Sequence, residues 1–152
     1  MPPADSPQRA AFGSLLSRAA RQWRRAADRG LEPFDLTEAT WLPLIRIARA
    51  PAPPRQKDVA AALGLDGSSV VRLLDNLEAA SLIQRREEAS DRRAKSIFLT
   101  AKGRTIANKV EAVARQVRTD ALATISDRDI ETTVRVLTQI CAALEEGDGE
   151  TA

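Results

Sequence analysis

The spacing of apolar residues changes from helical to alternating along residues 56–100, and this change constrains the fold more than any other feature of the sequence. Apolar residues at helical spacing predict a short helix over 56–63 and a second helix over 67–80. Gly64 ends the first helix, and Asp66 is a good N-cap for the second. Two helices joined by a short turn that contains glycine form a helix-turn-helix.

Two short strands, residues 82–87 and 96–100, follow this pair of helices. The charged segment between them, EEASDRRAK, is too long for a tight turn, so it predicts a hairpin with an extended charged tip. A hairpin placed directly after a helix-turn-helix defines a winged helix. We therefore expect a fold that is mainly α with a small β-hairpin wing.

Helical spacing continues on both sides of this winged helix. A first helix begins near Gln8 and stops at Gly30, and a second follows the cap Thr37, where Pro43 predicts a kink or a late start. Thr100 caps a further helix, and Ser126 or Asp127 caps the last one, which carries apolar residues on two sides. We expect the N- and C-terminal helices to interlock with those of a second copy as a homodimer. The domains predicted are a disordered N-terminus (1–7), an N-terminal dimerisation helix with its connection (8–35), a winged helix-turn-helix (36–100), C-terminal dimerisation helices (101–146) and an acidic tail (147–152).

The chain contains no His and a single Cys, which removes the imidazole that common zinc sites and catalytic triads require. It also has no Walker loop and no dinucleotide-binding glycine motif. We therefore expect no enzyme activity, no metal site and no cofactor. Cys141 falls on an apolar helical stripe, where it packs as a small hydrophobe rather than acting as a redox sensor. With no signal peptide and no apolar run of bilayer length, we expect a cytoplasmic protein without a membrane partner.

The net charge of +2 hides an uneven distribution along the chain. Basic residues are in excess in residues 1–30 and 55–104, whereas residues 105–152 are acidic. This distribution indicates that a polyanionic partner faces one side of the molecule, although runs of charged residues more commonly form a solvated surface.

The second helix of the helix-turn-helix has a polar face suited to reading DNA. If Val70, Leu73, Leu74 and Leu77 face the core, the residues that project the other way are Ser68, Ser69, Arg72 and Asn76. Arg can pair bidentately with guanine, and Asn with adenine, in the major groove of double-stranded DNA. The alternative is an ordinary exposed polar face.

The predicted hairpin tip carries three cations that can lie along a minor groove, namely Arg92, Arg93 and Lys95. We expect Asp91, the anion of this segment, to hold an arginine of the hairpin in position, either Arg85 or Arg93. A solvated charge run is again the alternative, but the neighbouring helix-turn-helix favours DNA.

The stretch from Trp41 to Gly103 resembles the MarR family of bacterial transcription regulators. Asp91-x-Arg93 followed by Leu99-Thr100-x-x-Gly103 matches the family's wing and the start of its next helix, and VVRLLDNLEAASLIQRREEASDRRAKSIFLT is especially similar to the SlyA-like branch. The resemblance implies an obligate homodimer on a pseudo-palindromic operator, associated with the bacterial nucleoid when bound. Ser68, Ser69, Arg72 and Asn76 would enter the major groove, Arg93 with Arg92 the minor groove, and Lys57 and Lys95 would contact phosphates.

The resemblance also implies regulation by a small aromatic or phenolic acid held between the dimer helices and the DNA-binding lobe. Trp23 and Trp41 are candidates to line such a crevice, and Arg46 to meet a carboxylate, while the alternative is that both Trp are plain core residues. Pro43 departs from the unbroken helix of the family and reshapes that crevice. The function predicted is a repressor released by its ligand; an activator or counter-silencer, and a winged-helix scaffold that binds protein, are the alternatives.

Overall fold

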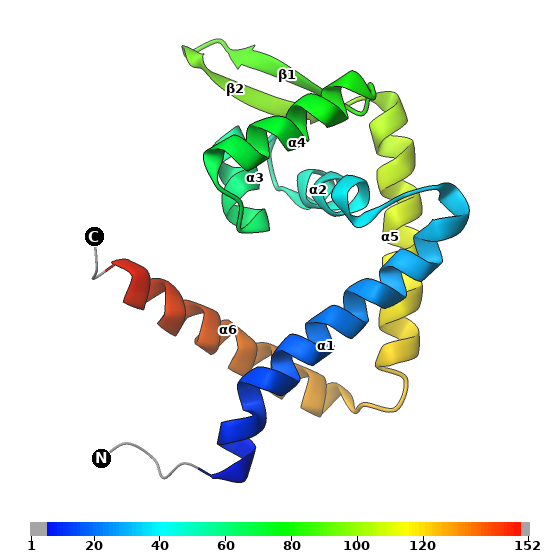
Figure 1. Ribbon diagram of the computed structural model, residues 1–152, viewed down its shortest axis with the longest axis vertical. Helices are drawn as coiled ribbons and strands as arrows, with labels where there is room; N and C mark the ends of the chain where they lie inside the picture. The colour runs from blue at the N-terminus through cyan, green and yellow to red at the C-terminus, as the bar shows by residue number, and fades with distance from the viewer. Residues whose placement is uncertain (1–5, 150–152) are drawn as a thin grey trace. The chain divides into compact units, whose positions relative to one another are not determined.

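The computed structural model describes residues 6–149 of the chain. The predictions for residues 1–5 and 150–152 lie outside the described residues. The chain divides into two compact units, Met1–Val117 and Arg118–Ala152, with the boundary inside a helix. In chain order the elements are α1 (Pro7–Leu31), the short 3-10 helix η1 (Glu32–Phe34), α2 (Glu38–Arg49), α3 (Gln56–Leu63), α4 (Gly67–Ala79), β1 (Ile83–Glu88), β2 (Asp91–Leu99), α5 (Ala101–Ala121) and α6 (Asp127–Gly149). The prediction of a mainly helical fold with one antiparallel hairpin is confirmed (Figure 1).

A first hydrophobic core holds the winged helix together. It joins α2, α3, α4 and the hairpin through residues that are nearly inaccessible to solvent: Leu44, Ile47, Val59, Val70, Leu74, Leu77, Leu82, Ile83 and Ile97. Figure 1 shows the hairpin lying along α4. Burial of large aliphatic side chains is the main stabilising term in such a core, so α4 and the hairpin are held by the same core.

A second core joins the C-terminal half of α1 to α2 and α5. Its buried members are Ala27, Leu31, Trp41, Ile45 and Val110. Helix α2 therefore contributes to both cores, and these contributions account for four of its five buried residues: Leu44 and Ile47 in the first core, Trp41 and Ile45 in the second. Ile47 of this helix is buried, whereas its neighbour Ala48 is exposed.

One expectation about a helix end is wrong. Gly30 does not stop α1, because the helix continues to Leu31 and its cap is Glu32. A side chain at Gly30 would lie only 2.5 Å from Cγ1 of Val113, so this glycine serves the close approach of α1 to α5. At Pro43 the sequence predicted a kink or a late start of the helix, and the late start does not occur, because α2 begins at Glu38 and Pro43 lies inside the helix.

The hairpin also differs from its prediction. The strands extend almost to the tip and leave a two-residue turn, Ala89-Ser90, between the paired residues Glu88 and Asp91. The register shifts between Glu87 and Glu88, which marks an irregularity near the tip. Arg93 and Lys95 therefore lie on strand β2 and not on a loop.

The second unit consists of the end of α5 and helix α6, which Ser126 caps by accepting a hydrogen bond from the amide of Asp129 at 3.2 Å. No residue of α6 whose side chain is described is buried, and Val134 and Leu144 are 59% and 68% exposed. Cys141, expected to pack as a small hydrophobe, is exposed as well. Among the described residues, no helix is both long enough and apolar enough to cross a membrane.

Candidate nucleic-acid interface

Helix α4 begins at a strong cap. The Asp66 carboxylate accepts hydrogen bonds from the amide of Ser69 at 2.7 Å and from the hydroxyl of Ser68 at 2.9 Å. These bonds, the amide of Ser69 first, hold the pKa of Asp66 below its usual value because they favour the charged form. The cap fixes where the helix starts, and so fixes which of its faces points outward.

The outward face of α4 is the one that the sequence predicted. Val70, Leu74 and Leu77 are buried on the inner side, and Leu73 is partly buried. Four exposed residues line an open groove of about 300 Å³ together with Leu73: Ser68, Ser69, Arg72 and Asn76. Within the described part of the chain, the Arg72 guanidinium forms no ion pair, so its donors are available to a partner.

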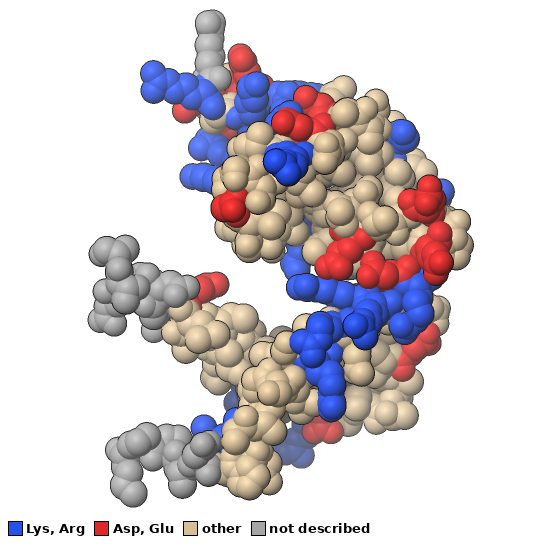
Figure 2. All heavy atoms as spheres, in the orientation of Figure 1, with Lys and Arg blue, Asp and Glu red and all other residues tan. Residues whose placement is uncertain are grey.

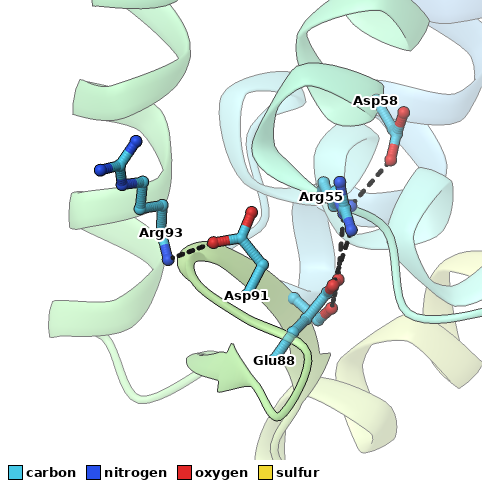
Figure 3. A network of polar contacts seen from close by, with 6 residues as sticks. Arg55, Asp58, Glu88, Asp91 and Arg93 are labelled. Atoms are coloured by element: carbon cyan, nitrogen blue, oxygen red, sulfur yellow. Dashed lines mark hydrogen bonds and ion pairs between the residues drawn. The ribbon is translucent and has the colours of Figure 1, made fainter.

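Strand β2 presents the basic residues of the wing. Arg93 and Lys95 are exposed, and the backbone amide of Arg93 donates to the Asp91 carboxylate at 2.9 Å. Figure 3 shows the Arg93 guanidinium pointing away from this carboxylate. Asp91 therefore orients the backbone of Arg93 and leaves its side chain unpaired. The side chain of Arg92 is outside the described set.

A partly buried edge of the hairpin is anchored to the start of α3. The Arg55 guanidinium donates to both oxygens of Glu88, at 3.0 and 2.6 Å, and the Ser96 hydroxyl donates to Glu88 at 2.8 Å (Figure 3). The bonds from Arg55, and then that from Ser96, hold the pKa of Glu88 below its usual value. The segment before α3 also pairs with β2, because the amide of Ile97 donates to the carbonyl of Pro54 at 2.9 Å.

A second anchor joins the hairpin to α4. The Arg85 guanidinium bonds the carboxylates of Asp75 and Glu78, and its bond to Glu78 is the main cause of the lowered pKa of that carboxyl. Arg85 is thus held by α4. The sequence had predicted that Asp91 holds either Arg85 or Arg93, and the first of these two alternatives does not occur. Sequence reasoning did not find Arg55, Glu88 or the two acids of α4, because no local spacing links residues of separate elements.

The remaining candidates are dispersed. Lys57 is exposed in the first turn of α3. Trp41 is a core residue whose indole N–H donates to Asp28 at 2.7 Å, whereas Trp23 is 42% exposed on α1 and Arg46 is exposed on α2. Trp41 is therefore a plain core residue, which was the alternative to a ligand-lining role, whereas Trp23 is not part of the core. The described residues outline cavities of about 240 to 430 Å³, and these are lined by side chains other than those of Lys57, Trp23, Trp41 and Arg46.

The fold and the exposed faces together define a winged-helix protein of the DNA-binding class. A model of the MarR family matches residues 34–94. The chain is 40% identical to transcriptional regulator PA3341, over 89% of this chain and 98% of that one, with a TM-score of 0.83. It is 30% identical to CouR from Rhodococcus jostii RHA1, solved with p-coumaroyl-CoA, over 85% of this chain and 90% of that one, with a TM-score of 0.76. A DNA complex of MepR from S. aureus is 28% identical over 87% of this chain and 97% of that one, with a TM-score of 0.74.

The chain belongs to the MarR family of transcriptional regulators. Members of this family are DNA-binding regulators of transcription. The side chains described here contain no group of three or more His, Cys, Asp or Glu that could hold a metal ion.

Proposed function

We propose that this regulator is a repressor that binds a pseudo-palindromic operator as a homodimer. The observation that carries the proposal is the groove on α4, where Ser68, Ser69, Arg72 and Asn76 face outward beside a wing with unpaired cations. In the major groove, Arg72 would pair with guanine and Asn76 with adenine, while the small hydroxyl residues allow close approach. Each lobe would read one half-site, so the two-fold of the dimer sets the symmetry of the operator.

The wing and α3 would hold the lobe in register. Arg93, with Arg92 beside it in the sequence, would enter the adjacent minor groove, and Lys57 and Lys95 would contact phosphates. The anchors at Arg55–Glu88 and Arg85–Glu78 support this arrangement, because they tie the hairpin to both helices of the helix-turn-helix. A lobe with fixed spacing between helix and wing is what two neighbouring grooves require.

The exposed apolar faces of the terminal helices support the homodimer. On α1, Phe12, Leu15 and Trp23 are 42%, 54% and 42% exposed, and on α6 the apolar side chains of Val134 and Leu144 are 59% and 68% exposed. Such faces mark an interaction surface. The dimerisation segments would be residues 8–35 and 101–146, and the DNA-binding domain would be residues 36–100. The regulator would belong to the SlyA-like branch and would act in the bacterial cytoplasm, at the nucleoid.

Release by a small aromatic acid completes the proposal. CouR, a relative at 30% identity, was solved with the thioester of an aromatic acid, which supports this ligand class. Trp23 and Arg46, both exposed, remain candidates to contact the ligand in the dimer, whereas Trp41 would support the site from the core.

Binding to the intergenic DNA beside the gene, measured by fluorescence anisotropy across a salt series, tests the proposal. We expect log Kd to depend steeply on log salt, with a slope near 0.9 per phosphate contact. Arg72→Ala should relax base preference, with a loss of about 1–3 kcal/mol on the cognate site. Arg93→Ala should weaken binding most at A·T-rich flanks, and Arg18→Ala on α1 is the control with the same change of charge.

Two outcomes contradict this proposal. A flat salt response, or equal affinity for random DNA, would favour the scaffold that binds protein. If Arg72→Ala and Arg93→Ala bind like the Arg18→Ala control, the DNA-facing surface lies elsewhere. A reporter fused to the bound promoter then separates repression from activation, because deletion of the regulator raises expression in the first case and lowers it in the second.

A further inference from the structure

Helix α1 carries a row of arginines that the proposed function leaves without a role. They recur at spacings of three, four and four residues, and we call them the arginine stripe: Arg18, Arg21, Arg25 and Arg29. At 3.6 residues per turn, this spacing keeps all four within about 80° of the helix circumference, over a length of about 16 Å. All four are exposed, and Figure 2 shows Lys and Arg side chains gathered over the part of this face that α1 occupies.

The charges of the arginine stripe are not neutralised within the described part of the chain. None of its members forms an ion pair there, and Arg21 donates to the exposed hydroxyl of Ser17 at 2.8 Å. The one acid of α1 is Asp28, whose carboxylate accepts the indole N–H of Trp41. Like charges four residues apart on a helix repel one another, so a bound polyanion relieves an unfavourable interaction.

The arginine stripe is distinct from the two other faces of α1. The buried face, with Ala27 and Leu31, packs in the second core. The exposed apolar face, with Phe12, Leu15 and Trp23, is the one proposed for the homodimer. At about 100° per residue, the centre of the stripe lies more than about 100° around the helix from the centre of either face. Neither the core nor the proposed dimer contact therefore uses the stripe.

Helix α2 separates the arginine stripe from the groove on α4. Trp41 and Ile45 of α2 pack with α1, whereas Leu44 and Ile47 belong to the core that holds α4. The stripe lies on the side of α1 that is turned away from its buried residues, and the groove on α4 is lined by other residues. A polyanion on the stripe is therefore bound in addition to the half-site that α4 would read.

The side chains of the stripe suit a phosphate backbone. The first lysine of the chain is Lys57, so α1 is basic through arginine alone, the side chain that pairs bidentately with phosphate. Ser14 and Gln22, both exposed, lie beside the stripe and add the hydroxyl and amide groups that contact nucleic-acid backbones. A duplex carries one charge per about 1.7 Å of its axis, so a row of about 16 Å faces about ten phosphates.

The arrangement favours nucleic acid over an acidic protein or a membrane. No large apolar side chain of α1 lies between the arginines of the stripe. The centre of a protein interface is rich in aromatic and other apolar side chains, and a helix on a lipid surface inserts an apolar face. The apolar face of α1 points elsewhere and is the one proposed for the dimer. What remains at the stripe is an extended row of charge, which matches a linear polyanion.

We propose that the arginine stripe binds the phosphate backbone of a second DNA segment, so that a dimer on its operator also holds another stretch of duplex. The operator half of this statement rests on the proposed function, whereas binding by the stripe does not require it. The second segment is held through phosphates alone, so its sequence does not matter.

A capture experiment with the full-length protein tests this proposal. The operator duplex is immobilised and saturated with protein, and the capture of a labelled duplex of random sequence is measured across a salt series. We expect capture with a Kd of about 10⁻⁴ to 10⁻⁶ M, the range of non-specific binding. The double variant Arg18→Gln, Arg25→Gln should weaken capture about ten-fold or more. It should also lower the slope of log Kd against log salt by about 1.8, because two phosphate contacts are lost.

The matched control removes the same charge from the same helix outside the stripe, as Arg9→Gln with Arg24→Gln, and should capture the second duplex like the parent. Both double variants should bind the operator itself like the parent, which excludes damage to the fold. Undiminished capture by the stripe variant, or an equal loss in the control, would overturn the proposal. Polyglutamate that displaces the second duplex at an equal concentration of charge would overturn it too, in favour of an acidic protein as partner.

A second measurement separates the stripe from the operator-reading face. The variant Arg72→Ala, Arg93→Ala lacks the main contacts proposed for the operator, and its binding to random duplex in solution should persist and remain salt-dependent. Adding Arg18→Gln and Arg25→Gln should then abolish most of what remains. Loss of all binding in the first variant would show that the stripe binds no DNA. A protein without operator preference whose binding still follows the stripe substitutions would instead refute the proposed function and leave the stripe in place.

Discussion

Replacing Gly103 with alanine should destabilise the protein, although alanine is the better helix former. Gly103 lies in the first turn of α5 and is buried. A side chain built at this position overlaps the carbonyl group of Leu82, at the entrance to the hairpin. That carbonyl accepts the amide of Thr100 at 3.1 Å, and the Thr100 hydroxyl donates to the carbonyl of Ser81 at 2.6 Å. The Thr100-x-x-Gly103 motif therefore joins α5 to the turn before β1.

The expected magnitude follows from three opposing contributions. Forcing one extra carbon into a packed site costs about 1–3 kcal/mol. Loss of the Thr100–Leu82 hydrogen bond costs about 0.5–1.5 kcal/mol more. Alanine in place of glycine inside a helix returns about 1 kcal/mol. We expect a net destabilisation of about 0.5–3.5 kcal/mol, which lowers the melting temperature by about 2–4 °C for each kcal/mol.

Urea unfolding followed by circular dichroism measures this change, with protein concentration held fixed because association shifts apparent stability. Gly13→Ala is the control, since Gly13 lies within α1 and a side chain there has no atom within 4 Å. The control should gain about 0.5–1 kcal/mol from helix propensity alone. A Gly103→Ala variant as stable as the parent, or stabilised like the control, would refute the steric argument.

Two further predictions concern the second core and the wing anchor. Trp41→Phe should destabilise the protein by about 1–3 kcal/mol, because it leaves the partly buried Asp28 carboxylate without its donor. In a double-mutant cycle followed by urea unfolding, Asp28→Ala should cost much less in the Trp41→Phe background than in the parent. Additive costs would contradict the hydrogen bond. The lowered pKa of Glu88 predicts that its contribution to stability is complete above the ordinary value of 4.5 and is lost as pH falls through the folded-state value. The stability advantage of the parent over Glu88→Gln should therefore shrink in acid, and an advantage that does not change with pH would show that the ion pair is not its source.

Local signals in the sequence were sufficient for most element boundaries. Gly64 has a left-handed backbone at the end of α3, with φ of 63°, and Asp66 caps α4 as its residue type predicts. Thr100 caps α5 by accepting the amide of Gly103 at 3.0 Å. Each of these signals acts within about four residues, so it can be recognised without knowledge of the fold.

The wing was predicted too short because its outer half has no hydrophobic alternation. Around the tip the strands pair charged and polar residues, with Glu87 opposite Lys95 and Arg86 opposite Ser96. What extends these strands is cross-strand pairing together with the Arg55–Glu88 contact, which spans 33 positions of the sequence. Likewise, Gly30 looked like a helix stop because its partner, Val113, lies on another helix.

The pairing of basic side chains separates those that build the DNA-binding lobe from those that face outward. Arg55 and Arg85 each bond carboxylates of the protein and hold the hairpin to α3 and α4. Arg72, Arg93, Lys57 and Lys95, in contrast, have no ion pair among the described side chains. A paired arginine would have to give up its carboxylate before it could bind a phosphate or a base, whereas an unpaired one gives up only water. The residues proposed to contact DNA are therefore those for which that exchange costs least, while the paired arginines determine the position from which they act.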